Sequence, residues 1–224
     1  MKIAILGHGT VGSGVAEILI ENANEVSAAA EKNIELGAIL DIRNFEGISY
    51  SDKFVSDFDE ILNDPEIGIV AEAMGGTEPA FSYIKAALEK GKNAVTSNKE
   101  LVAEKGAELL SIARAHNVNF LFEASVGGGI PLIRPLYSAM NAAGITEIAG
   151  ILNGTTNYIL TKMFRFGSDM KKRLPMLKGW DMRKEILPRT CLDLTPAAKL
   201  RYFLRWYGKR LCVRKKYPPR ALTK

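Results

Sequence analysis

Cysteine is scarce in this chain, and long apolar runs are absent from it. Its 224 residues include two cysteines, Cys191 and Cys212, which cannot build a disulfide framework or a four-ligand zinc site. No stretch approaches the ~20 apolar residues that a membrane-spanning helix requires. The opening apolar run, residues 3–6, is too short for the core of a signal peptide. We therefore expect a cytoplasmic protein with no membrane partner.

Acidic side chains are also scarce, but only in the last part of the chain. Residues 165–224 carry 4 Asp/Glu against 18 Lys/Arg, a net charge of +14. Residues 1–164 carry 21 Asp/Glu against 12 Lys/Arg, a net charge of −9. Both tryptophans and five of the nine prolines also fall in the basic part. The composition predicts a folded acidic region followed by an aberrant basic tail, 166–224, that is poorly ordered.

The acidic region alternates short apolar runs with amphipathic ones. Strands are predicted at 2–6, 34–41, 67–73, 93–96 and 118–122, and helices at 10–22, 58–62, 79–90 and 99–116. This βαβ alternation is typical of an α/β fold with a Rossmann-type, doubly wound parallel sheet. We expect it to form a domain over residues 1–125.

The pattern changes after the glycine run at 127–129. A helix is predicted from 130 to 143, then a strand at 145–152 and another helix opening at 153–157. Residues 126–165 therefore read as the start of a second, incomplete α+β catalytic domain that contributes to a substrate site.

A glycine-rich turn follows the first predicted strand and opens the first predicted helix. Its pattern is G-x-G-x-x-G, formed by Gly7, His8, Gly9, Thr10, Val11 and Gly12. In that context the glycines allow a tight turn, close approach of a pyrophosphate and close packing of helix on strand. The helix N-terminus then presents N–H groups to the phosphates. The turn predicts a dinucleotide site, whereas a merely tight βα turn is the alternative.

The end of the second predicted strand bears on the choice of coenzyme. Asp41 is placed to accept a hydrogen bond from the 2′-hydroxyl of an adenosine ribose, which favours NAD. Arg43 could instead pair with the 2′-phosphate of NADP. Both could also be solvated loop charges, so the coenzyme stays open between NADP and NAD.

Two further strands end in polar loops that belong at the same edge of the sheet. Gly76 and Thr77 follow the third strand, and Ser97 and Lys99 follow the fourth. An ammonium group at this edge can polarise a carbonyl or bind an anion. Lys99 is therefore our candidate catalytic residue, although a solvated lysine at a helix start has the same pattern.

Four segments in order resemble the N-terminal half of homoserine dehydrogenase. They are GHGTVG at 7–12, VTSNKELVA at 95–103, FEASVGGGIPLI at 122–133 and NGTTNYIL at 153–160. The resemblance runs from the first residue to about residue 163. It implies NAD(P)-dependent interconversion of L-homoserine and L-aspartate 4-semialdehyde, in threonine, methionine and isoleucine biosynthesis, by an enzyme that forms homodimers.

The resemblance also assigns roles to particular residues. It places Lys99 at the nicotinamide end of the coenzyme. It implies a monovalent cation site, usually sodium, at Glu123, Val126, Gly128 and Ile130, an oxygen-donor set that suits a hard cation. It implies a substrate-side loop at Asn153, Gly154, Thr155 and Thr156.

The basic tail departs from this family. The family supplies an acid and substrate-binding carboxylates from a later segment, and no such segment is present here. Asp193 and Lys199 stand six residues apart where the family has four. The tail is interpreted first as an out-of-frame translation, which leaves a truncated enzyme with little activity. A nucleic-acid-binding tail on a non-enzymatic NAD(P)-binding protein, and a related amino-acid dehydrogenase, are the alternatives.

Overall fold

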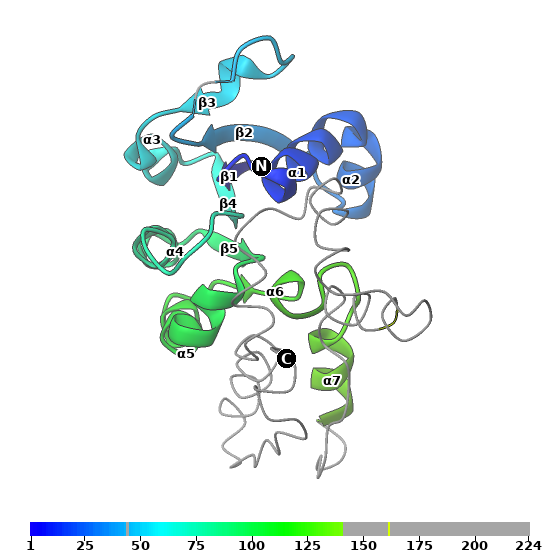
Figure 1. Cartoon of the computed structure of the whole chain (residues 1–224), viewed down its shortest axis with the longest axis vertical. Helices are drawn as coiled ribbons and strands as arrows, with labels where there is room; N and C mark the ends of the chain where they lie inside the picture. The colour runs from blue at the N-terminus through cyan, green and yellow to red at the C-terminus, as the bar shows by residue number, and fades with distance from the viewer. Residues whose placement is uncertain (44, 141–160, 162–224) are drawn as a thin grey trace. The chain divides into compact units, whose positions relative to one another are not determined.

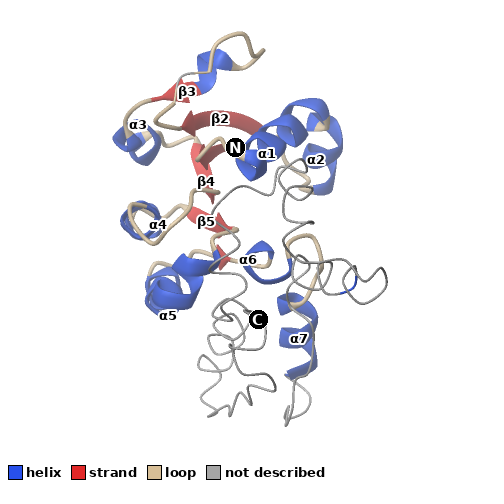
Figure 2. Ribbon diagram, in the orientation of Figure 1, coloured by secondary structure: helices blue, strands red, loops and turns tan. Residues whose placement is uncertain are grey.

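A six-stranded parallel sheet organises the first part of the chain (Figures 1 and 2). The computed structural model describes residues 1–43, 45–140 and 161. The strands are β1 (Lys2–Leu6), β2 (Glu35–Leu40), β3 (Phe54–Val55), β4 (Ile67–Glu72), β5 (Asn93–Thr96) and β6 (Phe120–Leu121), in the spatial order β3-β2-β1-β4-β5-β6. Every pairing is parallel, so the predicted doubly wound sheet is confirmed.

The described helices are α1 (Thr10–Glu21), α2 (Ala23–Ala29), α3 (Phe58–Asn63), α4 (Ala80–Glu89), α5 (Lys99–Ala115), α6 (Ala124–Gly127) and α7 (Ile133–Met140), with a short 3-10 helix η1 (Ser51–Lys53). The first five of them cover the two faces of the sheet. In Figure 1, α1 and α2 lie on one face of the sheet, and α3, α4 and α5 lie on the other. Helices α1, α3, α4 and α5 are those that the apolar periodicity predicts, with ends that differ by at most one residue.

Two of these helices begin with side-chain caps. Asp57 accepts a hydrogen bond from the Asp59 amide at 3.0 Å and completes a capping box with Glu60 at the start of α3. Asn98 accepts from the amides of Glu100 and Leu101, both at 3.1 Å, at the start of α5.

Apolar side chains of α1 pack on β1 and β2. The shared core cluster consists of Ile5, Ala16, Leu19, Ile34, Leu36 and Ile39. The helix follows β1 directly, so this packing holds the glycine turn at its N-terminus against the edge of the sheet.

Several elements differ from the sequence prediction, including η1 and α6, which were not predicted, and β6, which has two residues where the prediction has 118–122. Helix α2 has no buried residue, so it leaves no apolar periodicity to detect, and β3 has only two residues. The helix expected from residue 130 begins instead at Ile133, after the short helix α6. Pro131 disfavours the helical conformation at Ile130, which explains the later start.

The chain divides into two units, Met1–Leu136 and Tyr137–Lys224. All six strands and the helices through α6 belong to the first unit. The predicted strand at 145–152, the helix opening at 153 and the tail at 166–224 lie outside the described residues. Among the residues described, no helix has the length and apolar character needed to cross a membrane.

Candidate coenzyme-binding site

The turn between β1 and α1 lies where the strand order reverses. Gly7 has φ +92°, and a Cβ atom there would lie 2.9 Å from Cγ of Met74, just after β4. The Gly7 amide donates to the carbonyl of Leu40 at the end of β2, at 2.8 Å. The turn is thus wedged between the ends of β2 and β4, and only glycine combines this backbone conformation with this proximity. In open α/β sheets, ligands bind at this switch point.

The other two glycines of the turn have different requirements. A Cβ atom on Gly12 would lie 1.9 Å from the carbonyl oxygen of Gly7, so α1 can approach the turn only because residue 12 has no side chain. At Gly9, the N-cap of α1, a Cβ atom would meet nothing within 4 Å. Helix α1 then begins with Thr10 and Val11, and its N-terminal amides lie beside this open space. The geometry suits a pyrophosphate on the start of the helix.

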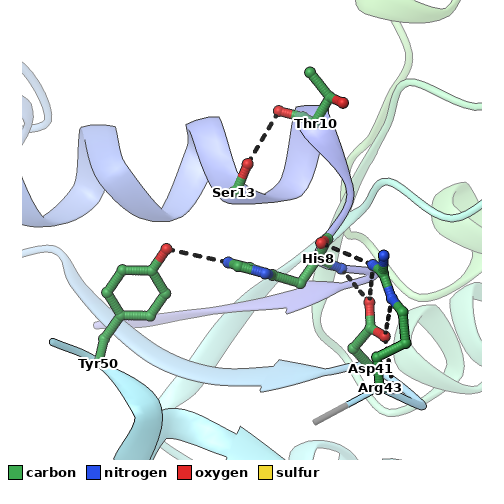
Figure 3. A network of polar contacts seen from close by, with 6 residues as sticks. All are labelled: His8, Thr10, Ser13, Asp41, Arg43 and Tyr50. Carbon is green, nitrogen blue, oxygen red and sulfur yellow. Dashed lines mark hydrogen bonds and ion pairs between the residues drawn. The ribbon is translucent and has the colours of Figure 1, made fainter. Parts of the chain in front are cut away.

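Asp41 and Arg43 form one compact unit with the glycine turn (Figure 3). The Asp41 carboxylate accepts from the His8 amide at 2.7 Å and from the Arg43 guanidinium at 2.9 and 3.0 Å. The same guanidinium donates to the His8 carbonyl at 2.8 Å. These hydrogen bonds, from Arg43 first, hold the pKa of Asp41 well below its usual range, so the carboxylate is ionised. The Asp41 carboxylate and the Arg43 guanidinium, the two candidates for contact with the adenosine ribose, therefore both lie beside the glycine turn.

The His8 ring is enclosed by aromatic side chains that the sequence prediction did not single out. Its centroid lies 4.5 Å from Phe45, 5.7 Å from Tyr50 and 5.1 Å from Phe54, each in an edge-on arrangement. Nε2 is 3.1 Å from the Tyr50 hydroxyl, while the buried Nδ1 has no hydrogen-bond partner among the described atoms (Figure 3). Burial lowers the pKa of His8. The signal available in the sequence was the grouping of three aromatic residues between positions 45 and 54, after β2.

The loops after β4 and β5 lie at the same edge of the sheet. Gly76 has φ +78°, and Thr77 donates its hydroxyl to Glu104 at 2.8 Å. The Ser97 amide donates to the Glu72 carbonyl at 3.2 Å, which links the two strand ends. Lys99 is the first residue of α5, and its side chain is exposed. The structure therefore brings these four predicted site residues to one edge.

A buried carboxylate joins these two loops and was missed at the sequence level. Glu72, the last residue of β4, is 2% exposed and accepts hydrogen bonds from the Thr96 hydroxyl, the Met74 amide at 2.7 Å and the Asn98 side chain at 3.4 Å. Burial raises the pKa of Glu72, although these hydrogen bonds oppose the shift. A lone glutamate at the end of an apolar strand gave no reason to expect this arrangement.

The predicted cation site runs from Glu123, the N-cap of α6, to Ile130, beyond the end of that helix. The Glu123 carboxylate accepts from the amides of Ile133 at 2.7 Å and Arg134 at 2.9 Å, so it caps α7. Burial would raise the pKa of Glu123, but its backbone hydrogen bonds lower it. At Val126, Gly128 and Ile130 a cation could use only backbone carbonyl oxygens, because these side chains carry no donor atom. Uncharged oxygen donors fit a hard monovalent cation and not a transition metal.

No cluster of three or more His, Cys, Asp or Glu suited to a metal ion occurs in the part of the chain that the structure describes. The predicted substrate-side residues Asn153, Gly154, Thr155 and Thr156 lie outside that part.

The sheet order, the glycine turn at its switch point and the acidic residue after β2 define a dinucleotide-binding protein of the Rossmann class. Comparison with known families agrees. Residues 7–123 match the sequence model of the homoserine dehydrogenase NAD binding domain, and residues 131–178 match that of homoserine dehydrogenase. The chain belongs to the homoserine dehydrogenase family.

Individual relatives support this membership. The homoserine dehydrogenase of Lactococcus lactis is 43% identical over 169 residues, which is 73% of this chain and 39% of that protein. The Synechocystis enzyme is 42% identical over 184 residues, 78% of this chain and 40% of that protein. The crystal structure of a homoserine dehydrogenase from Thiobacillus denitrificans superimposes with a TM-score of 0.77 at 32% identity, covering 89% of this chain and 47% of that one. The chain thus spans less than half the length of these relatives.

Proposed function

We propose that this chain carries the coenzyme-binding function of a homoserine dehydrogenase, which interconverts L-homoserine and L-aspartate 4-semialdehyde with NADP or NAD. The observation that carries the proposal is the glycine turn. Residue 12 must be glycine for α1 to approach, while the space beside Gly9 and the start of α1 is open. The named relatives, which are homoserine dehydrogenases, support the choice of reaction.

Different residues of the site bind the adenosine end and the nicotinamide end of the coenzyme. The amides at the start of α1 bind the pyrophosphate, and Asp41 or Arg43 binds the adenosine ribose. A bound reduced nicotinamide would supply a hydride to the aldehyde carbon of the substrate, and the resulting alkoxide would take its proton from the acid that the family supplies in a later segment. Lys99, with its side chain exposed at the start of α5, polarises the carbonyl and stabilises the developing alkoxide. Asn153, Gly154, Thr155 and Thr156 contact the polar substrate.

A monovalent cation, sodium in our proposal, binds the carbonyl oxygens of Val126, Gly128 and Ile130, with Glu123 contributing its own carbonyl or carboxylate. Its test compares thermal unfolding in sodium chloride with unfolding in choline chloride at equal ionic strength. A midpoint that rises with sodium concentration supports the site, and equal midpoints in the two salts contradict it.

Location and partners follow from the same proposal. We place the chain in the cytoplasm, with a small polar amino acid as substrate. The family forms homodimers, but its pairing surface falls largely in the altered region of this chain, so we expect this truncated chain not to pair. Light scattering during gel filtration tests this expectation, and a dimer would contradict it.

The basic tail limits the activity that we expect of these 224 residues. The family match ends at residue 178, within the tail, and the later acidic motifs of the family are absent. We expect the purified chain to bind NADPH or NADH and to show little or no turnover of aspartate semialdehyde. Robust turnover would show that the interpretation of the tail is wrong, and failure to bind either coenzyme would overturn the proposed function.

Sequencing the encoding DNA should reveal a neighbouring frame that continues the family motifs.

A further inference from the structure

Glu72 is a buried carboxylate that the proposed chemistry does not use. Its Oε1 accepts from the Met74 amide at 2.7 Å and from Asn98 Nδ2 at 3.4 Å, and its Oε2 accepts from the Thr96 hydroxyl. All these partners donate, which is the arrangement that an ionised carboxylate requires. A charge placed in a core is expensive unless it is fully hydrogen-bonded. A residue needed only to fill this space could be apolar, so the carboxylate calls for another explanation.

The hydrogen-bond partners of Glu72 belong to the two loops, after β4 and after β5, that we propose to contact the nicotinamide half of the coenzyme. Asn98 Nδ2 also donates to the Gly76 carbonyl at 2.6 Å, and Asn98 Oδ1 caps α5, whose first residue is Lys99. The Met74 amide lies in the segment that leads to Gly76. One carboxylate therefore connects the loop after β4 with the start of α5.

The Thr96 hydroxyl closes this connection. It donates to Glu72 and accepts from the Asn98 amide at 2.9 Å, so it fixes the backbone that immediately precedes Lys99. Loss of the hydroxyl would leave two buried polar groups, one on Glu72 and one on Asn98, without this partner.

We infer that Glu72 is a positioning residue, which holds Gly76 and Lys99 in place for the nicotinamide end of the coenzyme. The inference rests on the proposed function. A purely structural role of Glu72 would affect the binding of both halves of the coenzyme alike, whereas a positioning role would affect only the nicotinamide half. Glu72 should matter for the nicotinamide half of the ligand and leave the adenosine half, at Asp41 and the glycine turn, unaffected.

The test measures two affinities on the full chain by calorimetry, for NADH and for ADP-ribose, which lacks the nicotinamide. In Glu72→Gln we expect the NADH dissociation constant to rise about five- to tenfold and that of ADP-ribose to change less than about twofold. The fluorescence of the bound dihydronicotinamide should fall in parallel. The control Ile61→Val removes one methyl group from the core at α3 and should leave both affinities unchanged.

A second pair of variants carries the test if Glu72→Gln does not fold. Thr96→Val removes the hydroxyl at nearly constant volume and should weaken NADH selectively, whereas Thr96→Ser keeps the hydroxyl and should bind like the unaltered chain. Equal weakening of NADH and ADP-ribose, or no weakening, overturns the inference. The inference is also overturned if the unaltered chain binds NADH and ADP-ribose with equal affinity and the fluorescence of NADH does not change on binding. An unaltered chain that binds neither ligand refutes the proposed function itself.

Discussion

A Cβ atom on Gly12 would lie 1.9 Å from the carbonyl oxygen of Gly7. Real side chains do not approach a carbonyl oxygen so closely, and the obstacle is backbone, which cannot swing away. The first turn of α1 would have to move outward from the sheet. That turn also carries the amides proposed to bind the pyrophosphate, so the contact between Gly7 and Gly12 links packing to coenzyme binding.

Gly12→Ala is therefore expected to abolish measurable NADPH and NADH binding and to lower the free energy of unfolding by about 1–3 kcal/mol. Denaturant titration and calorimetry measure the two effects. Gly14→Ala is the matched control in the same helix, because a Cβ atom there meets nothing within 4 Å. It should bind coenzyme normally and gain up to ~1 kcal/mol in stability. Equal behaviour of the two variants would contradict the steric argument.

Asp41 and Arg43 should contribute to different coenzymes. Asp41→Ala removes the acceptor for a ribose hydroxyl and should weaken NADH more than NADPH. Arg43→Ala removes the guanidinium and should weaken NADPH more than NADH, each by roughly tenfold or ~1.4 kcal/mol. The dissociation constants of NADH and NADPH, measured for each of the two variants, show which residue contributes to which coenzyme. If each variant weakens both coenzymes to the same extent, the pair acts only as a structural clamp on the turn.

His8 should make stability depend on pH below neutrality. Burial lowers the pKa of His8 in the folded chain, so the unfolded chain binds more protons once the pH falls below about 6.5. Asp41 and Glu17 oppose this shift and Arg43 adds to it. The free energy of unfolding should therefore fall as the pH drops from 6.5 toward the folded pKa of His8. Chemical denaturation at pH 7.5 and 5.5 measures the fall.

His8→Phe should show a smaller fall over this range, because phenylalanine can occupy the aromatic enclosure without titrating. His116→Gln is the control, since His116 is exposed at the end of α5. It should retain the full fall. A His8→Phe variant with the pH dependence of the unaltered chain would rule out His8 as the source.

Glu123 should act as a helix cap whether or not a cation binds. Glu123→Ala leaves the amides of Ile133 and Arg134 without this acceptor and should cost about 1 kcal/mol in stability. Glu108→Ala is the control, because its exposed ion pair with Lys105 is worth little. Thermal unfolding in sodium-free buffer separates the cap from the cation. If Glu123→Ala lowers the thermal stability only when sodium is present, Glu123 belongs to the cation site and does not act as a helix cap.

Much of the dinucleotide site could be predicted because its signals are local. The strand at 2–6, the glycine turn and the helix at 10–22 are consecutive, and each glycine has a backbone reason that a short sequence motif encodes. The parallel sheet followed from the alternation of apolar runs with amphipathic ones. The predicted cofactor residues Asp41, Gly76, Ser97 and Lys99 follow strand ends, so a correct sheet places them at one edge.

Other features depended on contacts between distant parts of the chain. The Thr96 hydroxyl meets the Glu72 carboxylate across 24 residues of sequence, and the His8 amide meets Asp41 across 33. The enclosure of His8 and the capping of α7 by Glu123 are of the same kind. Neither the periodicity nor the motifs indicated which polar groups would be buried or which partners they would find.

By itself, the sequence determined the class of fold, the family and the position of the glycine turn, because these depend on local periodicity and on backbone freedom at single residues. Only the tertiary structure decided that Glu72 joins two loops and that Asp41 is held by Arg43. Burial of a polar group is tolerated only where the sheet brings a donor to it, and that meeting is a property of the packed chain as a whole.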